Sequence, residues 1–178
     1  MGKPTLYILT GISFAGKSVL ARELSAFLDI PRLDPDEVSN EYGWGRDGEF
    51  LSDEQWALVH GETERRASWL LIAGQSVVYD TTAFTYEQRT ALRQLAIDSG
   101  ADACVIFVNT PRAIAYERWG LNEVCSTRSR VHPSDFAMVA DLFEPPVDEP
   151  HLRYDSGDDV KTWIASHFAV ERANREHR

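Results

Sequence analysis

The chain has 178 residues, of which 43% are hydrophobic and 26% charged, as expected for one globular domain with a continuous core. Its formal net charge of -10 argues against partners such as duplex nucleic acid or an anionic membrane surface, because both are negatively charged and bind basic protein surfaces. The two cysteines, Cys104 in an apolar run and Cys125 in a polar segment, form neither a metal-ligand pair nor a disulfide framework.

The first ten residues, MGKPTLYILT, have no long apolar run before the first predicted strand. No stretch of the chain reaches membrane-spanning length. We therefore expect a cytoplasmic protein without a secretory signal and without membrane contact.

A glycine-rich loop follows the first predicted strand. Residues 5–10 (TLYILT) form an apolar, β-branched run typical of a buried parallel strand, and residues 11–18 (GISFAGKS) match the pattern G-x-x-x-x-G-K-[ST]. Residues 19–28 then place leucines and a phenylalanine on one face of a helix. Strand, loop and helix in this order are typical of a phosphate-binding loop, and an ordinary glycine turn is the alternative.

The residues of this loop suit a polyphosphate bound with Mg²⁺. Successive backbone N–H groups and the helix N-terminus can point at anionic oxygens. Lys17 adds a cation for the β- and γ-phosphates, and the Ser18 hydroxyl is placed to bind Mg²⁺. The predicted cofactors are therefore ATP and Mg²⁺, and the predicted nucleotide-binding residues are Gly11, Ser13, Ala15, Gly16, Lys17, Ser18 and Val19.

Carboxylates follow the second predicted strand, residues 30–33. Asp34 and Asp36 lie at the edge where open α/β sheets bind ligands, so one can face a metal or support its neighbour while the other faces an acceptor hydroxyl. The alternative is a solvated Asp-Pro-Asp turn that caps the next helix. The segment 42–48, rich in glycine and aromatic residues, is either an acceptor-binding flap or a plain loop with Trp44 packed inward.

A long helix occupies the middle of the chain. Ser52 and Gln55 form a capping-box pair that opens a helix ending at about residue 73. Trp56 and Trp69 lie on this helix, and we expect both to pack in the core.

The third predicted strand, residues 76–79, ends at another carboxylate, Asp80. This is the pattern of a Walker-B aspartate, which holds Mg²⁺ directly or through water, and a helix cap is the alternative. In the first turn of the next helix, residues 85–97, Arg89 opposes the helix dipole. We expect a local anion, such as Asp80 or an acceptor phosphate, to hold Arg89 there.

Arginines gather after the fourth predicted strand, residues 103–108. Thr110 is predicted to cap a helix with Pro111 at its first position. We expect a lid over about residues 112–135, whose guanidinium groups close on a transferring phosphate. The alternative is ion pairing with neighbouring glutamates on a solvated helix. The arginines concerned are Arg112, Arg118, Arg128 and Arg130.

The remaining segments complete an alternation of strands and helices. A helix beginning at Ser134, a strand over residues 152–154 and a helix from residue 160 are followed by a charged tail, residues 171–178, which we expect to fray. This order predicts an α/β fold with a doubly wound, five-stranded parallel sheet in a single domain, residues 1–178.

The sequence resembles the small P-loop kinases grouped with polynucleotide kinase, zeta-toxin-like kinases and chloramphenicol phosphotransferase. The resemblance extends over residues 5–168 and rests on GISFAGKS, LDPDEV, VVYDTT, VNTPR and FEPP. It implies a P-loop NTPase fold with an AAA-type ATP-binding domain and an arginine-bearing helical lid. It also implies that Asp36 accepts the proton of the acceptor hydroxyl, with Asp34 as its partner. Polynucleotide kinases usually carry an arginine where Ser39 stands here, which, with the acidic net charge, argues against a polynucleotide substrate.

These observations predict a kinase that moves the γ-phosphoryl group of Mg-ATP to a hydroxyl of a small-molecule acceptor, such as a nucleoside, an antibiotic or a sugar. The alternatives are a polynucleotide 5′-hydroxyl kinase and a nucleotide-binding switch that transfers no phosphate. The predicted catalytic residues are Asp36, Lys17, Arg118, Arg128 and Arg130. The predicted metal ligands are Ser18 and Asp80, and the predicted acceptor-binding residues are Asp34, Asp36, Trp44 and Arg89.

Overall fold

The computed structural model describes residues 2–45, 50–125 and 131–176. The strands are β1 (Thr5–Thr10), β2 (Arg32–Leu33), β3 (Val77–Tyr79), β4 (Asp102–Asn109) and β5 (Leu152–Asp155). The helices are α1 (Lys17–Leu28), α2 (Pro35–Glu41), α3 (Asp53–Ile72), α4 (Tyr86–Asp98), α5 (Arg112–Cys125), α6 (Pro133–Leu142) and α7 (Val160–Glu176). Every helix in these ranges is too short or too polar to span a bilayer.

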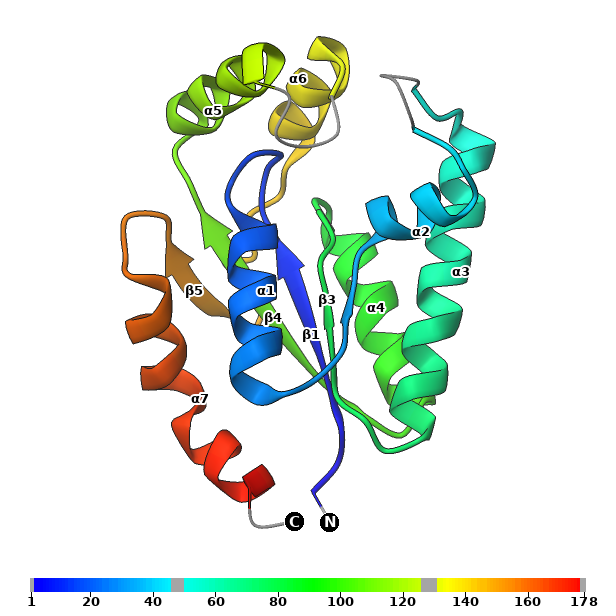
Figure 1. Cartoon of the computed structure of the whole chain (residues 1–178), viewed down its shortest axis with the longest axis vertical. Helices are drawn as coiled ribbons and strands as arrows, with labels where there is room; N and C mark the ends of the chain where they lie inside the picture. The colour runs from blue at the N-terminus through cyan, green and yellow to red at the C-terminus, as the bar shows by residue number, and fades with distance from the viewer. Residues whose placement is uncertain (1, 46–49, 126–130, 177–178) are drawn as a thin grey trace.

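Across the described residues the strands form one five-stranded sheet in the order β2-β3-β1-β4-β5, and all neighbours are parallel. The predicted doubly wound parallel sheet is therefore confirmed. In this arrangement the chain leaves β1, β2, β3 and β4 at one edge of the sheet, the carboxyl edge. The segments that carry the glycine loop, the aspartates and the arginines thus emerge side by side (Figure 1).

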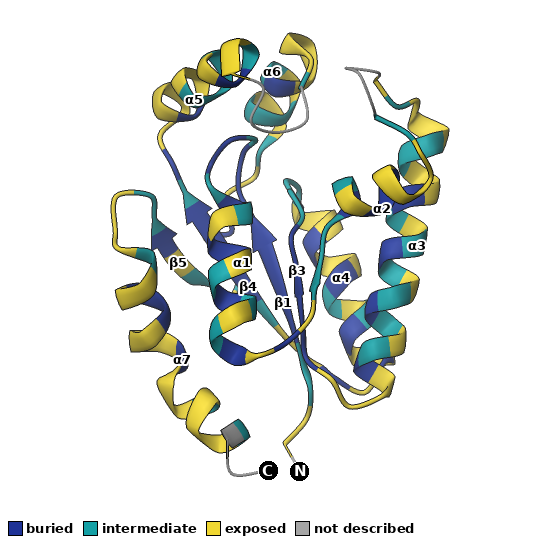
Figure 2. Cartoon of the chain, in the orientation of Figure 1, coloured by how far each residue is buried: buried dark blue, intermediate teal, exposed yellow. Residues whose placement is uncertain are grey.

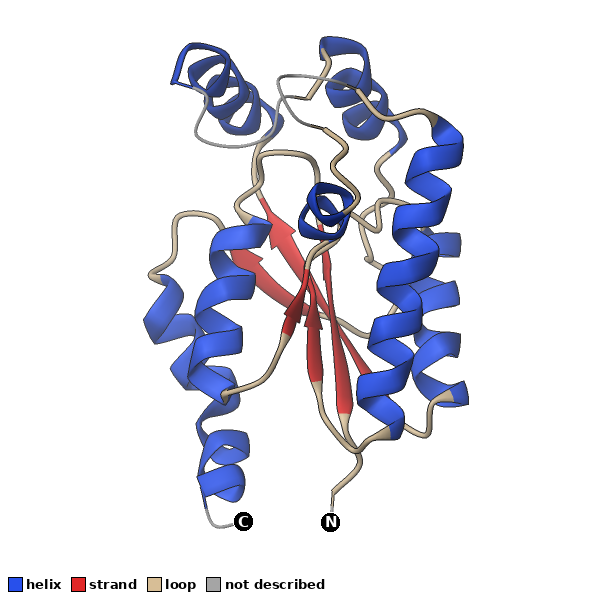
Figure 3. Cartoon of the chain, turned by 45° about the vertical axis from the view of Figure 1, so that its right-hand side comes forward, coloured by secondary structure: helices blue, strands red, loops and turns tan. Residues whose placement is uncertain are grey.

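Helices cover both faces of the sheet. Helices α1 and α7 lie on one face, and α3 and α4 lie on the other (Figures 1 and 3). The side chains of β1 alternate accordingly: Tyr7 and Leu9 join the core beneath α1 and α7, whereas Leu6 and Ile8 join the core beneath α3 and α4. The central strands β1 and β3 are buried, whereas the edge strands β2 and β5 are only partly covered, and the outer faces of the helices are exposed (Figure 2).

Helices α5 and α6 lie beyond the carboxyl edge of the sheet rather than on either face (Figure 1). Trp119 of α5 stacks on Phe136 of α6, with ring centroids 5.8 Å apart. Phe14 of the glycine loop packs against the same Phe136 at 6.3 Å. An aromatic cluster therefore joins the two helices to the loop beneath them.

The second strand is shorter than predicted. It was expected over residues 30–33, but β2 contains only Arg32 and Leu33. The amide of Ile30 donates to the carbonyl of Ser25 at the end of α1, and Pro31 has no N–H to donate. Pairing with β3 therefore begins at the carbonyl of Pro31, which accepts the amide of Val78 at 2.9 Å, and continues through Arg32 and Leu33.

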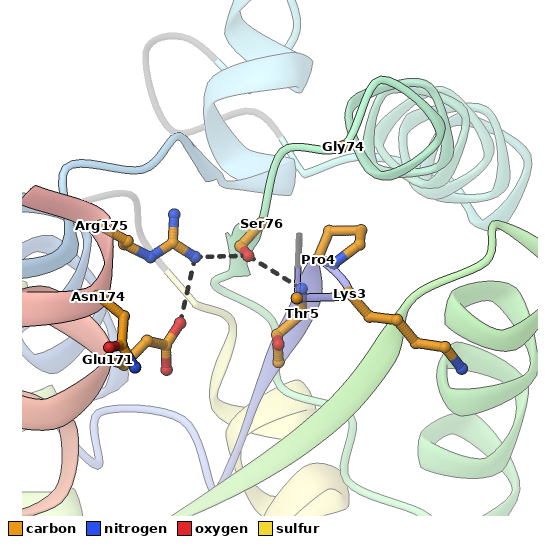
Figure 4. Close-up of a pocket in the computed structure, with 9 residues that line it drawn as sticks. Lys3, Pro4, Thr5, Gly74, Ser76, Glu171, Asn174 and Arg175 are labelled. Carbon is orange, nitrogen blue, oxygen red and sulfur yellow. Dashed lines mark hydrogen bonds and ion pairs between the residues drawn. The ribbon is translucent and has the colours of Figure 1, made fainter. Parts of the chain in front are cut away.

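The structure differs from two expectations, one about Trp69 and one about the C-terminal tail. Trp69, expected in the core, has 67% of its surface exposed on α3. The tail expected to fray, residues 171–178, is helical to Glu176, where Arg175 donates to Ser76 Oγ (2.6 Å) and to Glu171 Oε1 (3.1 Å), and residues 177 and 178 lie outside the described residues. Figure 4 shows these bonds beside a cavity of about 200 Å³ at the opposite, amino edge of the sheet. They hold the last turns of α7 against the segment leading into β3.

A buried ion pair fixes the connection between α6 and β5. Arg89, 1% exposed, donates from Nε to Glu149 Oε1 at 2.8 Å and from Nη1 to the carbonyl of Ala83 at 3.0 Å. Arg93 approaches the other oxygen of Glu149 at 2.5 Å. Glu149, rather than Asp80 or a phosphate, is therefore the anion that holds Arg89 in the first turn of α4.

Replacing Arg89 with methionine should lower the free energy of unfolding by about 3–5 kcal/mol, because it leaves the Glu149 carboxylate buried with less compensation. Denaturant unfolding followed by circular dichroism measures this change. Arg112→Met is the control: Arg112 forms an exposed pair with Asp141, and its loss should cost less than about 1 kcal/mol. Equal effects of the two substitutions would contradict the structural role assigned to Arg89.

Candidate active site

The glycine loop, residues 11–18, turns the chain sharply between β1 and α1. Gly11 has φ 149° and Gly16 has φ 102°, conformations that favour glycine. A Cβ on Gly11 would lie 2.7 Å from the carbonyl oxygen of Val108, so the loop passes directly against β4. Phe14 also adopts a positive φ, 61°, and its ring is buried. The conformation of the loop therefore depends on the residues at these three positions.

The side chain of Lys17 lies inside this loop. It is the first residue of α1, and its Nζ donates to the carbonyls of Gly11 (2.9 Å) and Ile12 (2.8 Å). Only 9% of the residue is exposed. A buried ammonium group held by backbone carbonyls is a cation placed at the N-terminus of a helix, the position that also attracts anions.

Two further donors hold the outside of the loop through the carbonyl of Ala15. Thr110, directly after β4, donates from Oγ1 at 2.7 Å, and Arg118 of α5 donates from Nη1 at 3.1 Å. Arg118 also reaches the carbonyl of Phe14 at 3.3 Å. The arginine predicted to act from the lid therefore contacts the glycine loop. The hydroxyl of Thr110, which was expected to cap α5, is instead bonded to this loop.

A second group of polar residues lies at the ends of β2 and β3. The carboxylate of Asp80 is 3% exposed; it accepts a hydrogen bond from the Ser18 hydroxyl and another from Arg32 Nη1 at 2.8 Å. Burial and the nearby charge of Asp34 raise the pKa of Asp80, while Ser18, Arg32 and Lys17 oppose that rise. The two residues predicted as metal ligands, Ser18 and Asp80, are thus in contact.

Asp34 and Asp36 lie at the start of α2. The Oδ1 atom of Asp34 accepts the amide of Asp36 at 2.9 Å, so Asp34 is the N-cap of the helix. Asp34 therefore caps the helix, but its side chain is only 17% exposed and pairs with Arg32, so the turn is not the solvated one that the alternative described. Asp36 is half-buried in the first turn, and its own carbonyl accepts the hydroxyl of Ser39 at 2.9 Å.

The remaining predicted site residues are Trp44, Arg89, Arg128 and Arg130. Trp44 stacks on Tyr42, with ring centroids 4.8 Å apart, and is half-buried. Arg89 is engaged with Glu149, as described above, so the acceptor contact suggested for it has no support in its surroundings. Arg128 and Arg130 lie outside the described residues.

Two residues at this edge, Arg32 and Thr110, have contacts that the sequence analysis does not predict. Arg32 belongs to the predicted strand 30–33, and its guanidinium joins Asp34 to Asp80. A signal was present, because an arginine two residues before an aspartate at the carboxyl edge of a sheet is a charge in an otherwise apolar position. Thr110 likewise occupies the first position after an apolar strand, the edge at which ligand-binding groups gather.

The polar atoms at this edge fit Mg²⁺. The Ser18 hydroxyl and the Asp80 carboxylate supply oxygen ligands, which this ion prefers. Within the described ranges no group of three or more His, Cys, Asp or Glu residues is arranged as a metal site. Mg²⁺ usually takes only one or two carboxylates from a protein and completes its shell with water and substrate phosphates, so the fit rests on Ser18 and Asp80.

A family model described as an AAA domain matches residues 6–146. No curated protein matches the sequence. Among solved structures, a putative kinase from Chloroflexus aurantiacus is 20% identical with a TM-score of 0.72, and the match covers 93% of this chain and 97% of that one. An APS kinase from Mycobacterium tuberculosis in complex with AMPPNP and APS is 18% identical (TM-score 0.69, coverage 98% and 99%). A gluconokinase from Sinorhizobium meliloti is 16% identical (TM-score 0.66, coverage 99% and 98%). At these identities the likenesses establish the P-loop NTPase fold.

Replacing Gly11 with alanine should lower the free energy of unfolding by about 1–3 kcal/mol or more, because the residue combines a positive φ with a contact to the Val108 carbonyl. Urea unfolding measures the change. Gly61→Ala, in the interior of α3 where a Cβ meets no heavy atom within 4 Å, should instead stabilise by about 1 kcal/mol. A neutral Gly11→Ala would mean that the loop does not need this conformation.

Proposed function

The chain belongs to the AAA domain family, and from this premise we propose that it is a P-loop kinase that moves the γ-phosphoryl group of Mg-ATP to a hydroxyl of a small-molecule acceptor. The single observation that carries the proposal is the position of Lys17, a buried cation inside a glycine loop at a helix N-terminus. The similar solved structures include an APS kinase with AMPPNP and a gluconokinase, which supports a nucleotide donor and a small acceptor.

The contacts at the glycine loop indicate which residues would bind the phosphate donor, ATP. When the β- and γ-phosphates enter, Lys17 can exchange its bonds with the carbonyls of Gly11 and Ile12 for the phosphate oxygens. Arg118, already at the loop, supplies a second cation for the developing charge. Ser18 and Asp80 would hold Mg²⁺, which when bound neutralises charge on the β- and γ-phosphates. Arg128 and Arg130 remain predictions as lid residues.

The acceptor side is assigned to the start of α2. In the proposed reaction Asp36 orients the acceptor hydroxyl and takes its proton as the oxygen bonds to the γ-phosphorus and ADP leaves. Asp34 is bound to Arg32 and to the amide of Asp36, so its role is to position the helix turn that carries Asp36. Trp44 stays a candidate contact for the acceptor.

The proposed function predicts that the purified protein with Mg-ATP phosphorylates at least one member of a panel of nucleosides, sugars, antibiotics and short oligonucleotides. Mass spectrometry detects the product as a gain of one phosphoryl group. Lys17→Met should abolish the transfer, because the cation facing the β- and γ-phosphates is lost. Transfer to an oligonucleotide alone would favour the polynucleotide kinase alternative, and calorimetric ATP binding without any transfer would favour the switch.

Asp36→Asn should leave ATP affinity unchanged but lower kcat by about 10²–10⁴-fold, because an amide cannot accept the hydroxyl proton. Calorimetry with a nonhydrolysable ATP analogue and steady-state kinetics measure the two quantities separately. Glu41→Gln, at the other end of α2, is the matched control and should change kcat by less than about two-fold. Normal transfer by Asp36→Asn would overturn the assignment of the base.

A further inference from the structure

Arg32 lies where a cation is needed between two carboxylates. Its Nη1 atom is 2.6 Å from Asp34 Oδ2 and 2.8 Å from Asp80 Oδ2, so both N–H groups of this nitrogen are in use. Its Nη2 atom donates to Glu37. The side chain is 11% exposed, and its backbone is fixed in β2 opposite β3. The guanidinium is therefore held in place from the strand and from each of its two terminal nitrogens.

The charges around Arg32 explain why a cation is required there. Asp80 and Asp34 approach the same nitrogen, and both carboxylates are largely withdrawn from water. Two buried carboxylates that face one another repel, and burying each one is costly without a counter-charge. Within the described part of the chain, Arg32 is the cation that binds both of them directly.

The same position offers oxygen ligands for a metal ion. Asp80 also accepts the hydroxyl of Ser18, so Asp80 links Ser18 on one side to Arg32 and Asp34 on the other. Hydroxyl and carboxylate oxygens are the ligands that Mg²⁺ and Mn²⁺ prefer. Arg32 Nη1, at hydrogen-bond distance from the Oδ2 atoms of both carboxylates, occupies the position from which such an ion would bridge them.

We propose that Arg32 is a built-in counter-ion that takes the place of a divalent cation between Asp34 and Asp80 in the nucleotide-free protein. Replacing it with a neutral side chain then creates a divalent-cation site, formed by Ser18, Asp34 and Asp80, that needs no nucleotide. The inference rests on the proposed function in linking Ser18 and Asp80 to a metal. In the unmodified protein Arg32 acts as a positioning residue, and metal binding at this edge depends on the phosphates of the nucleotide.

The test is a titration of the nucleotide-free protein with MnCl₂, followed by the loss of the free Mn²⁺ signal in electron paramagnetic resonance. The unmodified protein should bind Mn²⁺ only weakly, with Kd above about 1 mM. Arg32→Met should bind one Mn²⁺ at least about ten-fold more tightly. Arg32→Lys, which keeps a cation, should behave as the unmodified protein does.

Two control variants locate the site. Arg66→Met removes an arginine that pairs with Glu41 and Glu62 away from Asp80, and it should gain no Mn²⁺ affinity. Adding Asp80→Asn to Arg32→Met should remove the gained site. Tight Mn²⁺ binding by the nucleotide-free unmodified protein, or no gain in folded Arg32→Met, would overturn the proposal.

The Mn²⁺ titration tests the role of Arg32 separately from the folding of the variant and from kinase activity. If Arg32→Met unfolds, MnCl₂ should restore its circular dichroism spectrum, because the metal replaces the missing charge. Failure of Mn²⁺ to restore both Arg32→Met and Arg32→Gln would also overturn the proposal. Since the titration contains no ATP and no acceptor, a gained Mn²⁺ site in a protein without kinase activity would reject the proposed function and leave the role of Arg32 standing.

Discussion

The carboxyl edge of the sheet depends on one interaction, in which the carbonyl of Ala15 accepts hydrogen bonds from two donors. Ala15 is fully buried, so its carbonyl oxygen must find donors inside the protein, and it finds them in Thr110 and Arg118. These donors come from the end of β4 and from α5, which fixes both elements relative to the loop. Gly11 packs directly against the carbonyl of Val108, which also fixes the loop relative to β4. The position of the arginine-bearing helix is therefore a consequence of how a buried loop satisfies its backbone.

The other half of the edge is organised by charge rather than by backbone. Asp80, Asp34 and Glu37 surround Arg32 at the ends of β2 and β3. The two halves meet where Ser18, the second residue of α1, donates to Asp80. A group bound by the glycine loop would thus lie next to a region of negative charge that already contains its own counter-ion. This juxtaposition suits a site where a phosphate, a cation and a hydroxyl must come together.

Much of the fold follows from local sequence, and the parts that do not follow share a physical cause. The glycine pattern, the apolar strands and the capping box at Ser52 predicted elements that the structure contains, because each signal lies within a few adjacent residues. The partners of Arg89 and Thr110 are Glu149 and Ala15, 60 and 95 residues away in the chain. Spacing carries no information about such contacts. Arg32 and Asp80, 48 residues apart, belong to the same class.

The same distinction separates the two sides of the candidate active site. The glycine loop and α1 are anchored in the core beneath α1 and α7, through residues such as Phe14 and Leu20. Helix α2 contributes no residue to either of the two main core clusters described. It is held by its buried Val38, by its cap at Asp34, by the pair of Asp34 with Arg32 and by the bond from Arg66 to Glu41.

The exposed side chains of α2 can change at small cost to the core, because single exposed ion pairs such as that of Arg66 with Glu41 contribute little stability. A buried loop cannot, since each of its carbonyls needs a donor. In the proposed kinase the phosphate donor would therefore be bound by the invariant part of the architecture, and the acceptor would be chosen by α2 and the segment that follows it. A change of acceptor would then require substitutions around Asp36 and Trp44 while Gly11, Lys17 and Thr110 stay in place.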